Sequence, residues 1–200
     1  MFIDIVLPRN NEEEFIQIAS RLGLKGLRFL YDFDKYQNQK SSIFDFDVEI
    51  GFLVNQKNMN KAMQKSRLLA VKSSDKDMFF IESKKINVIY GFEEISSRDY
   101  LHQRASGLNH IICELAEKND VAVGFSYSSL FNKNNEVTAL SIGRMMQNIK
   151  LCGKYKVKIV IGCFSSNPFD LRAPHDVMSL FEMMGMRQEE IKESLTYTSN

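Results

Sequence analysis

Seven short, mostly apolar segments recur along the chain, and a stretch with helical spacing of apolar residues follows most of them. Strands that alternate with helices pair in parallel within one sheet. Nearly continuous apolar runs are typical of strands that are covered on both faces. The pattern therefore predicts an α/β protein, either a doubly wound sheet or a βα barrel. The predicted strands are residues 2–7, 26–31, 48–54, 68–71, 86–90, 121–125 and 157–163.

Apolar residues one turn apart predict the helices between these strands. The chain has 200 residues and no linker or low-complexity tract, so we expect a single domain over residues 1–200. A barrel of this length would be small and irregular, because TIM barrels usually need about 250 residues. The predicted helices are residues 13–22, 58–66, 100–118, 138–153, 176–185 and 188–195, with a further one that Ser74 or Asp75 would cap.

The overall composition is that of a soluble protein in a reducing compartment. Hydrophobic residues make up 44% of the chain and charged residues 26%. No apolar run approaches the roughly 20 residues that cross a bilayer, and the opening "MFIDIVLPRNNEEEF" has no signal-peptide pattern. Cys113, Cys152 and Cys163 lack CxxC spacing and predict buried free thiols. We expect a cytoplasmic protein in which these cysteines bind no metal.

Charge is unevenly distributed along the chain, although the net charge is only +1. Residues 51–74 and 138–168 contain no acidic residue but several lysines and arginines. Such segments either direct a polyanion to one side of the protein or form ordinary solvated faces, and charge alone leaves both open. Lys57, Lys61 and Lys65 are spaced by four, which places them on one face of a helix where a phosphate backbone would relieve their repulsion.

Small polar residues follow the ends of four predicted strands. In parallel α/β folds, functional residues gather at the carboxyl ends of the strands. Gly124 would allow a backbone or a ligand to approach closely. The serines at these ends either contact phosphates or cap helices. The four segments are "KSSD" (72–75), "GFEEISSR" (91–98), "GFSYSS" (124–129) and "CFSSNPFDLR" (163–172).

Residues for hydrolytic active sites are scarce. A multinuclear metal site needs several histidines and carboxylates to activate water, but the chain has three histidines in all and no histidine pair after its first strand. The sequence also lacks a GxSxG elbow and a glycine-rich phosphate loop. A metal-dependent phosphoesterase of the PHP class, or another barrel enzyme acting on a small phosphorylated molecule, is the alternative function.

Two linked blocks resemble the ribonuclease P protein component 3 family of archaea, which is related to a eukaryotic RNase P/MRP subunit. The first block is "GLNHIICELAEKNDVAVGFSYSSL" (107–130). The second runs from "MMQNIKLCGKYKVKIVIGCFSS" to "DLRAPHDVMSLFEMMGM" (170–186). The clear match covers residues 107–186, and the earlier part matches in its strand–helix rhythm and in "VKSSD" (71–75).

The resemblance implies a fold, a function and partners. The fold would be a small irregular TIM-like barrel related to the PHP phosphoesterases. The protein would be a subunit of RNase P, an endoribonuclease that removes the 5′ leader of precursor tRNA and leaves a 5′ phosphate. The RNase P RNA would use Mg²⁺ and perform the hydrolysis, so this chain would bind no cofactor and have no catalytic residue. A small ferredoxin-like protein subunit would pair with it as a heterodimer or heterotetramer.

The sequence departs from the family pattern at two places. Tyr127, Ser128 and Ser129 stand where the family usually has a Leu-Arg-Pro-like run, and His175 stands where it has an arginine. We therefore expect RNA contacts from the acid-free segments and the strand ends. The predicted RNA-binding residues are Lys57, Lys61, Lys65, Lys72, Arg98, Ser126, Arg144, Lys154, Lys158 and Arg172.

Four residues of the family-like blocks have predicted structural roles. His110 would pack within its helix and bond to the backbone, and Gly124 would allow a close approach. Pro174 would fix the entry into the next helix, which Asp176 would cap or open. Arg172, nearby, would bond either to a phosphate or to Asp176.

Overall fold

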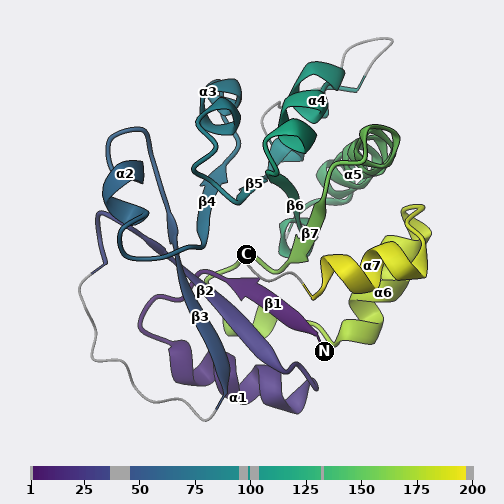
Figure 1. Ribbon diagram of the computed structural model, residues 1–200. Helices are drawn as coiled ribbons and strands as arrows, with labels where there is room; N and C mark the ends of the chain where they lie inside the picture. Colours follow the sequence, from purple (N-terminus) through teal and green to yellow (C-terminus); the bar gives the residue numbers. More distant parts are fainter. Residues whose placement is uncertain (1, 37–45, 95–98, 100–103, 132, 197–200) are drawn as a thin grey trace.

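The computed structural model describes residues 2–36, 46–94, 99, 104–131 and 133–196. Its strands form one parallel sheet in which each strand pairs with the next one along the chain. The helices surround the strands on the outside (Figure 1). All seven predicted strands are confirmed within a few residues. They are β1 (Ile3–Val6), β2 (Gly26–Asp32), β3 (Asp47–Leu53), β4 (Leu69–Lys72), β5 (Val88–Tyr90), β6 (Ala122–Ser126) and β7 (Ile159–Gly162).

Contacts between β1 and the end of β7 curl the sheet into a nearly closed barrel. The backbone N–H of Phe164 donates to the carbonyl of Ile5 at 2.8 Å, and the N–H of Leu7 donates to the carbonyl of Ser165 at 2.9 Å. First and last strands do not meet in this way in an open sheet. The barrel is therefore the correct one of the two architectures that the sequence left open.

The outer layer contains seven α-helices in the described part of the chain. A 3₁₀ turn also follows each of β5, β6 and β7. The α-helices are α1 (Glu12–Arg21), α2 (Met59–Ala62), α3 (Asp77–Glu82), α4 (His110–Lys118), α5 (Asn135–Tyr155), α6 (Pro174–Met183) and α7 (Gln188–Ser194). The turns are η1 (Phe92–Glu94), η2 (Tyr127–Leu130) and η3 (Pro168–Asp170).

Three helix predictions were wrong in extent or in capping. The helix predicted for 100–118 begins at His110, because Gly107 has a φ of 78° and the Asn109 side chain caps the helix by accepting from the Ile112 N–H. The helix predicted for 58–66 has only four residues, with turns on both sides. Neither Ser74 nor Asp75 caps α3, which starts at Asp77.

Side chains fill the barrel in two separate layers. One cluster lies inside the barrel, and a larger one lies between the strands and the helices. Alternation along β1 shows the division, since Ile5 belongs to the inner cluster and Val6 to the outer one. The three cysteines are buried, free and part of the outer layer, which confirms the prediction. The inner cluster is Ile5, Leu30, Leu68, Ala70, Val88, Tyr90, Ala122, Val160 and Phe164.

None of the described helices is both long enough and apolar enough to cross a bilayer.

Candidate functional site

The carboxyl ends of the strands, with the segments that follow them, form one end of the barrel, here called the barrel mouth. Two aromatic rings fill its centre. Tyr90 ends β5 and Phe164 follows β7, and their rings stack with centroids 4.3 Å apart and 12° between their planes. A Cβ atom at Gly124 would lie 2.8 Å from the Tyr90 Cβ. Gly124 thus allows a close approach, as predicted, but of neighbouring side chains within the core.

A buried carboxylate stands at the seam between β1 and β7. The Tyr127 hydroxyl donates to Asp4 Oδ2 at 2.5 Å, and the Cys163 N–H donates to Asp4 Oδ1 at 2.7 Å. Burial raises the pKa of Asp4 to about 6, against the lowering effect of these two hydrogen bonds. The Asp4 carboxylate therefore joins the seam to η2.

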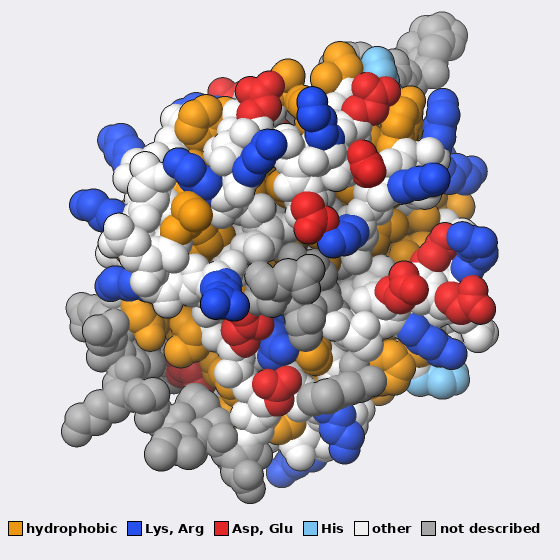
Figure 2. All heavy atoms as spheres, in the orientation of Figure 1, with side chains coloured by type: hydrophobic (Ala, Val, Ile, Leu, Met, Phe, Trp, Pro, Cys, Tyr) orange, Lys and Arg blue, Asp and Glu red, His pale blue; other side chains and the backbone are white. Residues whose placement is uncertain are grey.

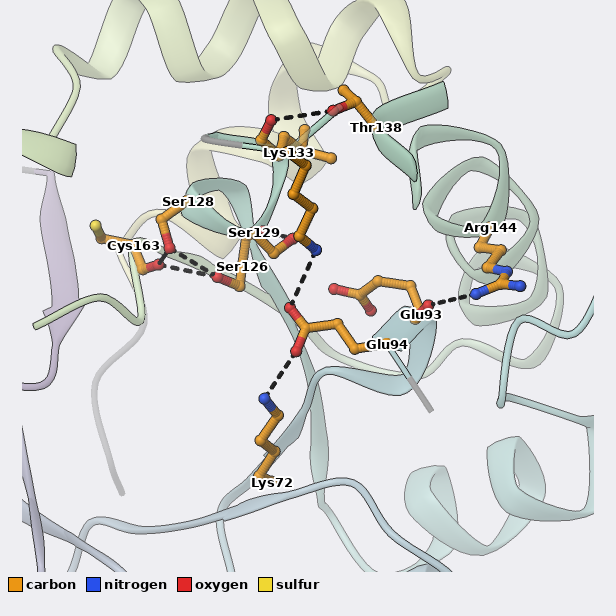
Figure 3. A network of polar contacts seen from close by, with 11 residues as sticks. Lys72, Glu93, Glu94, Ser126, Ser128, Ser129, Lys133, Thr138, Arg144 and Cys163 are labelled. Carbon is orange, nitrogen blue, oxygen red and sulfur yellow. Dashed lines mark hydrogen bonds and ion pairs between the residues drawn. The ribbon is translucent and has the colours of Figure 1, made fainter. Parts of the chain in front are cut away.

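The serines at the end of β6 and in η2 bind the backbone that leaves β7 (Figure 3). The hydroxyls of Ser126 and Ser128 donate to the Cys163 carbonyl at 2.9 and 2.5 Å, and the Ser129 hydroxyl donates to the Ser126 carbonyl. Ser126 is buried. The RNA contact predicted for Ser126 does not fit this arrangement, because its hydroxyl is enclosed and already bonded.

Two consecutive glutamates in η1 have opposite surroundings (Figure 3). The Glu94 carboxylate lies 2.7 Å from the Lys72 ammonium group and 3.9 Å from that of Lys133. Glu93 is 1% exposed, and no other described residue donates a hydrogen bond to its carboxylate oxygens. Burial raises the pKa of Glu93 to about 7. Lys72, which was predicted to bind RNA, is exposed but forms an ion pair with Glu94.

Arg144 is a structural residue of α5. Its side chain is 4% exposed, its Nε lies 2.7 Å from Asp99 Oδ1, and its Nη1 donates to the Glu93 carbonyl at 3.0 Å. A buried guanidinium that holds η1 against α5 is not placed to meet a phosphate. The prediction of Arg144 as an RNA contact therefore does not fit the structure.

The predicted lysine row is exposed, although it is not a helical row. Lys61 lies in α2, whereas Lys57 and Lys65 lie in the turns on either side of it. The Lys65 ammonium group stands 5.5 Å from the centre of the Phe33 ring. No described carboxylate forms an ion pair with these three lysines. Their exposure was predicted correctly, and RNA binding by them stays a prediction.

Lys154 and Lys158 lie at the end of the barrel opposite the mouth. Lys154 is in the last turn of α5, 5.2 Å from the Tyr155 ring centre, and Lys158 precedes β7 and pairs with Asp120 at 2.6 Å. Positive and negative side chains are interspersed on the face that Figure 2 shows. The predicted cations therefore do not gather on one surface. Arg98 lies outside the described residues.

Within the described chain Arg172 does not pair with Asp176, and a phosphate contact by Arg172 stays a prediction. Its Nη1 donates to the carbonyls of Phe169 and Leu171 at 2.9 and 2.8 Å, and its guanidinium lies 4.2 Å from the centre of the Phe131 ring. Pro174 is the first residue of α6, as predicted. Asp176 lies in the first turn of α6 without a capping hydrogen bond.

His110 is the exposed first residue of α4, so the prediction that it packs inside the helix layer was wrong. Within the described ranges, no three His, Cys, Asp or Glu side chains are grouped as a metal site.

Two adjoining cavities open at the mouth beside the ends of β1 to β4. Their volumes are ≈ 600 and ≈ 620 Å³, and both are lined by Asp32 and Leu53. Arg9, Lys35 and Tyr36 line the first cavity. These three residues were not among the predicted site residues, although each follows the end of a predicted strand.

The family model for RNase P subunit p30 matches residues 1–200. The chain belongs to the RNase P subunit p30 family. Ribonuclease P protein component 3 of Methanothermobacter thermautotrophicus is 27% identical, over 98% of this chain and 86% of that protein. The same component of Methanosarcina barkeri is 24% identical, over 94% of this chain and 80% of that protein.

Solved structures support the same barrel fold for this RNase P subunit. A chain in a cryo-EM structure of archaeal ribonuclease P with mature tRNA matches with a TM-score of 0.78 and 18% identity, covering 96% of this chain and 87% of that one. A crystal structure of an amidohydrolase matches with a TM-score of 0.59 and 9% identity, covering 98% and 72%. The barrel that the resemblance implied is thus confirmed.

Proposed function

We propose that this chain is a non-catalytic subunit of RNase P that supports the catalytic RNA as it removes the 5′ leader from precursor tRNA. The observation that carries the proposal is the filled centre of the barrel mouth. A barrel hydrolase keeps its reacting groups at this end. Here the rings of Tyr90 and Phe164 fill the centre, and the Asp4 carboxylate is enclosed by Tyr127 and the Cys163 backbone.

Lys57, Lys61 and Lys65 are the proposed contacts to RNA phosphates. All three are exposed, and no described carboxylate neutralises them. An RNA phosphate backbone would neutralise these lysines, and binding would release the counterions of the RNA. Mg²⁺ acts with the RNA in this scheme. A relative of the same fold comes from a structure of RNase P with mature tRNA, which supports an RNA partner for this chain as well.

A small ferredoxin-like protein subunit is the proposed protein partner, in a heterodimer or heterotetramer in the cytoplasm. The helical outer surface offers apolar area for it. Met78 and Phe79 on α3 and Ile111 on α4 are 47%, 46% and 47% exposed, and α3 packs beside α4. Size-exclusion chromatography of the two co-expressed chains should show one complex. Separate elution at micromolar concentration would contradict this pairing.

The test of the RNA contacts is reconstituted cleavage of precursor tRNA with the RNA and the protein subunits. Changing Lys57, Lys61 and Lys65 together to alanine should weaken assembly and flatten its salt dependence by roughly two to three phosphate contacts. A control variant with Lys25, Lys84 and Lys118 changed to alanine removes the same charge from exposed positions that precede strands. Equal salt slopes in the two variants would contradict the proposed contacts.

The non-catalytic role has its own test. The chain alone, with Mg²⁺, Mn²⁺ or Zn²⁺, should not hydrolyse phosphoesters. Metal-dependent turnover that Asp4→Asn abolishes would overturn the role and favour a barrel phosphoesterase.

A further inference from the structure

The two cavities beside β1 to β4 form one positively charged groove along the mouth. Among their described lining residues, five side chains are cationic and two are acidic. The five cations are Arg9, Lys35, Lys57, Lys72 and Lys76, and the acids are Asp32 and Asp75. Each volume falls within the range of roughly 300–1,000 Å³ that is usual for small-ligand pockets. We call this feature the rim groove.

Several of these cations are available to an anionic ligand. The side chains of Arg9 and Lys57 are exposed and form no ion pair or hydrogen bond within the described chain. Lys35 is 84% exposed, and its ion pair with Asp32 spans 3.3 Å between two solvated groups. Such an exposed pair contributes little to stability, so a phosphate can compete for Lys35.

Aromatic rings form one wall of the rim groove. Tyr31 and Tyr36 both line its first cavity and are half-buried. The Tyr36 ring is 5.0 Å from that of Tyr31 and 5.1 Å from that of Phe52, measured between centroids. Packing from two sides holds the Tyr36 ring at the groove edge. Proteins bind unpaired RNA with such a combination, because bases stack on a fixed ring while nearby cations neutralise the phosphates.

We propose that the rim groove binds an unpaired segment of RNA, with phosphates at Arg9 and Lys35 and a base against Tyr36. This inference rests on the proposed function, because the inference specifies which form of RNA the chain contacts at the barrel mouth. An RNA duplex is a poorer fit, since its bases are stacked inside the helix and cannot reach a ring that lines a cavity. Rings fill the centre of the barrel mouth, whereas its β1–β4 side is hollow among the described residues.

The test is fluorescence anisotropy of the full chain with labelled decauridine and with an RNA duplex of matched length. The salt slope is the change in the logarithm of the binding constant with the logarithm of the salt concentration, and each phosphate contact on a single strand contributes roughly 0.7 to it. Arg9→Gln with Lys35→Gln removes two contacts and should therefore reduce the magnitude of the slope for decauridine by about 1.4. Tyr36→Leu keeps an apolar side chain and should weaken decauridine binding at least about fivefold without changing the slope. Duplex binding should change less than twofold in both variants.

The matched control is Lys25→Gln with Lys84→Gln, which removes two exposed cations at the opposite end of the barrel. If the groove variants and the control give equal slopes, or if duplex and decauridine binding fall together, the inference is wrong. Reconstituted cleavage separates this result from the proposed function. If cleavage requires the chain but the groove variants bind decauridine normally, only the rim-groove inference is wrong. If cleavage does not require the chain, the proposed function is wrong.

Discussion

The ring of Phe164 lies nearly parallel to that of Tyr90, across the top of the barrel interior, with 4.3 Å between centroids. The backbone holds Phe164 in the left-handed region, with a φ of 49°. A non-glycine residue adopts this conformation only where its surroundings impose it. Here the ring packs against Gly124 and Gly162, whose missing Cβ atoms make the space. The filled mouth therefore depends on two glycines as much as on two aromatic rings.

Gly124→Ala should destabilise the barrel. The added methyl group would lie 2.8 Å from the Tyr90 Cβ and 3.0 Å from Val88 Cγ1, so the closely packed interior must shift. We expect a loss of about 1–3 kcal/mol in the free energy of unfolding, measured by urea titration. Gly153→Ala is the control, because apart from the adjacent helix backbone no described atom lies within 4 Å of its added methyl group, and in helix α5 it should gain about 0.5–1 kcal/mol. Equal effects at both glycines would contradict the packing argument.

Tyr127→Phe should destabilise the protein in a pH-dependent way. The change removes the hydroxyl that donates to the buried Asp4 carboxylate at 2.5 Å. The pKa of Asp4, already raised by burial to about 6, should rise further. The loss in unfolding free energy should be about 1–3 kcal/mol near pH 8, where Asp4 is charged, and smaller near pH 5, where it is protonated.

The control for the seam is Tyr155→Phe, since the Tyr155 hydroxyl forms no hydrogen bond within the described chain. Urea titrations at both pH values measure the two variants. A loss for Tyr127→Phe that is the same at both pH values would show that Asp4 does not carry the effect.

The strands were predictable because their signal is local. An apolar run such as residues 157–163 must be covered on both faces wherever it lies, so its own composition identifies it. The start of α4 also had a local signal, since Gly107 and the capping residue Asn109 stand just before it. The prediction followed the apolar spacing over residues 100–118 instead, so the predicted helix is longer than α4.

The roles of polar residues were not predictable, because their partners are remote in sequence. Asp4 and Tyr127 are 123 positions apart, and Arg144 and Asp99 are 45 apart. A lone arginine in an acid-free segment indicates an exposed cation, and only the fold shows that Arg144 is enclosed. The rim groove was missed for the same reason, since it is assembled from the ends of separate strands.

Arg144→Gln should act on stability and leave the phosphate contacts unchanged. Removing one partner of a fully buried ion pair costs about 3–5 kcal/mol, and the loss here should be smaller because Asp99 is partly exposed, although the Arg144 guanidinium also holds the Glu93 carbonyl. We expect a lower unfolding free energy by urea titration. RNA binding at low temperature, where the variant is folded, should keep the wild-type salt slope.

Lys150→Gln is the matched control for Arg144, because Lys150 is an exposed cation on the same helix. It should change stability by less than about 0.5 kcal/mol. A reduced salt slope in folded Arg144→Gln would show that Arg144 does contact phosphate.

The buried Glu93 carboxyl group should make the stability of the protein depend on pH near neutrality. Glu93 is 1% exposed, no other described residue donates a hydrogen bond to its carboxylate, and burial raises its pKa from 4.5 to about 7. Between these two values the folded protein keeps a proton that the unfolded chain has released. The stability contributed by the neutral carboxyl group is therefore complete below about pH 4.5 and is lost as the pH rises to about 7.

Glu93→Gln should flatten this dependence, since an amide has nearly the same shape and no charge to bury. Over the window from about pH 4.5 to 7, the slope of unfolding free energy should become less negative by up to roughly 1.4 kcal/mol for each pH unit. The variant should be more stable than the wild type at pH 8 and similar to it at pH 4. Glu117→Gln, at an exposed position of α4, is the control and should leave the slope unchanged. Parallel curves for Glu93→Gln and the wild type would mean that Glu93 already has a partner in solution.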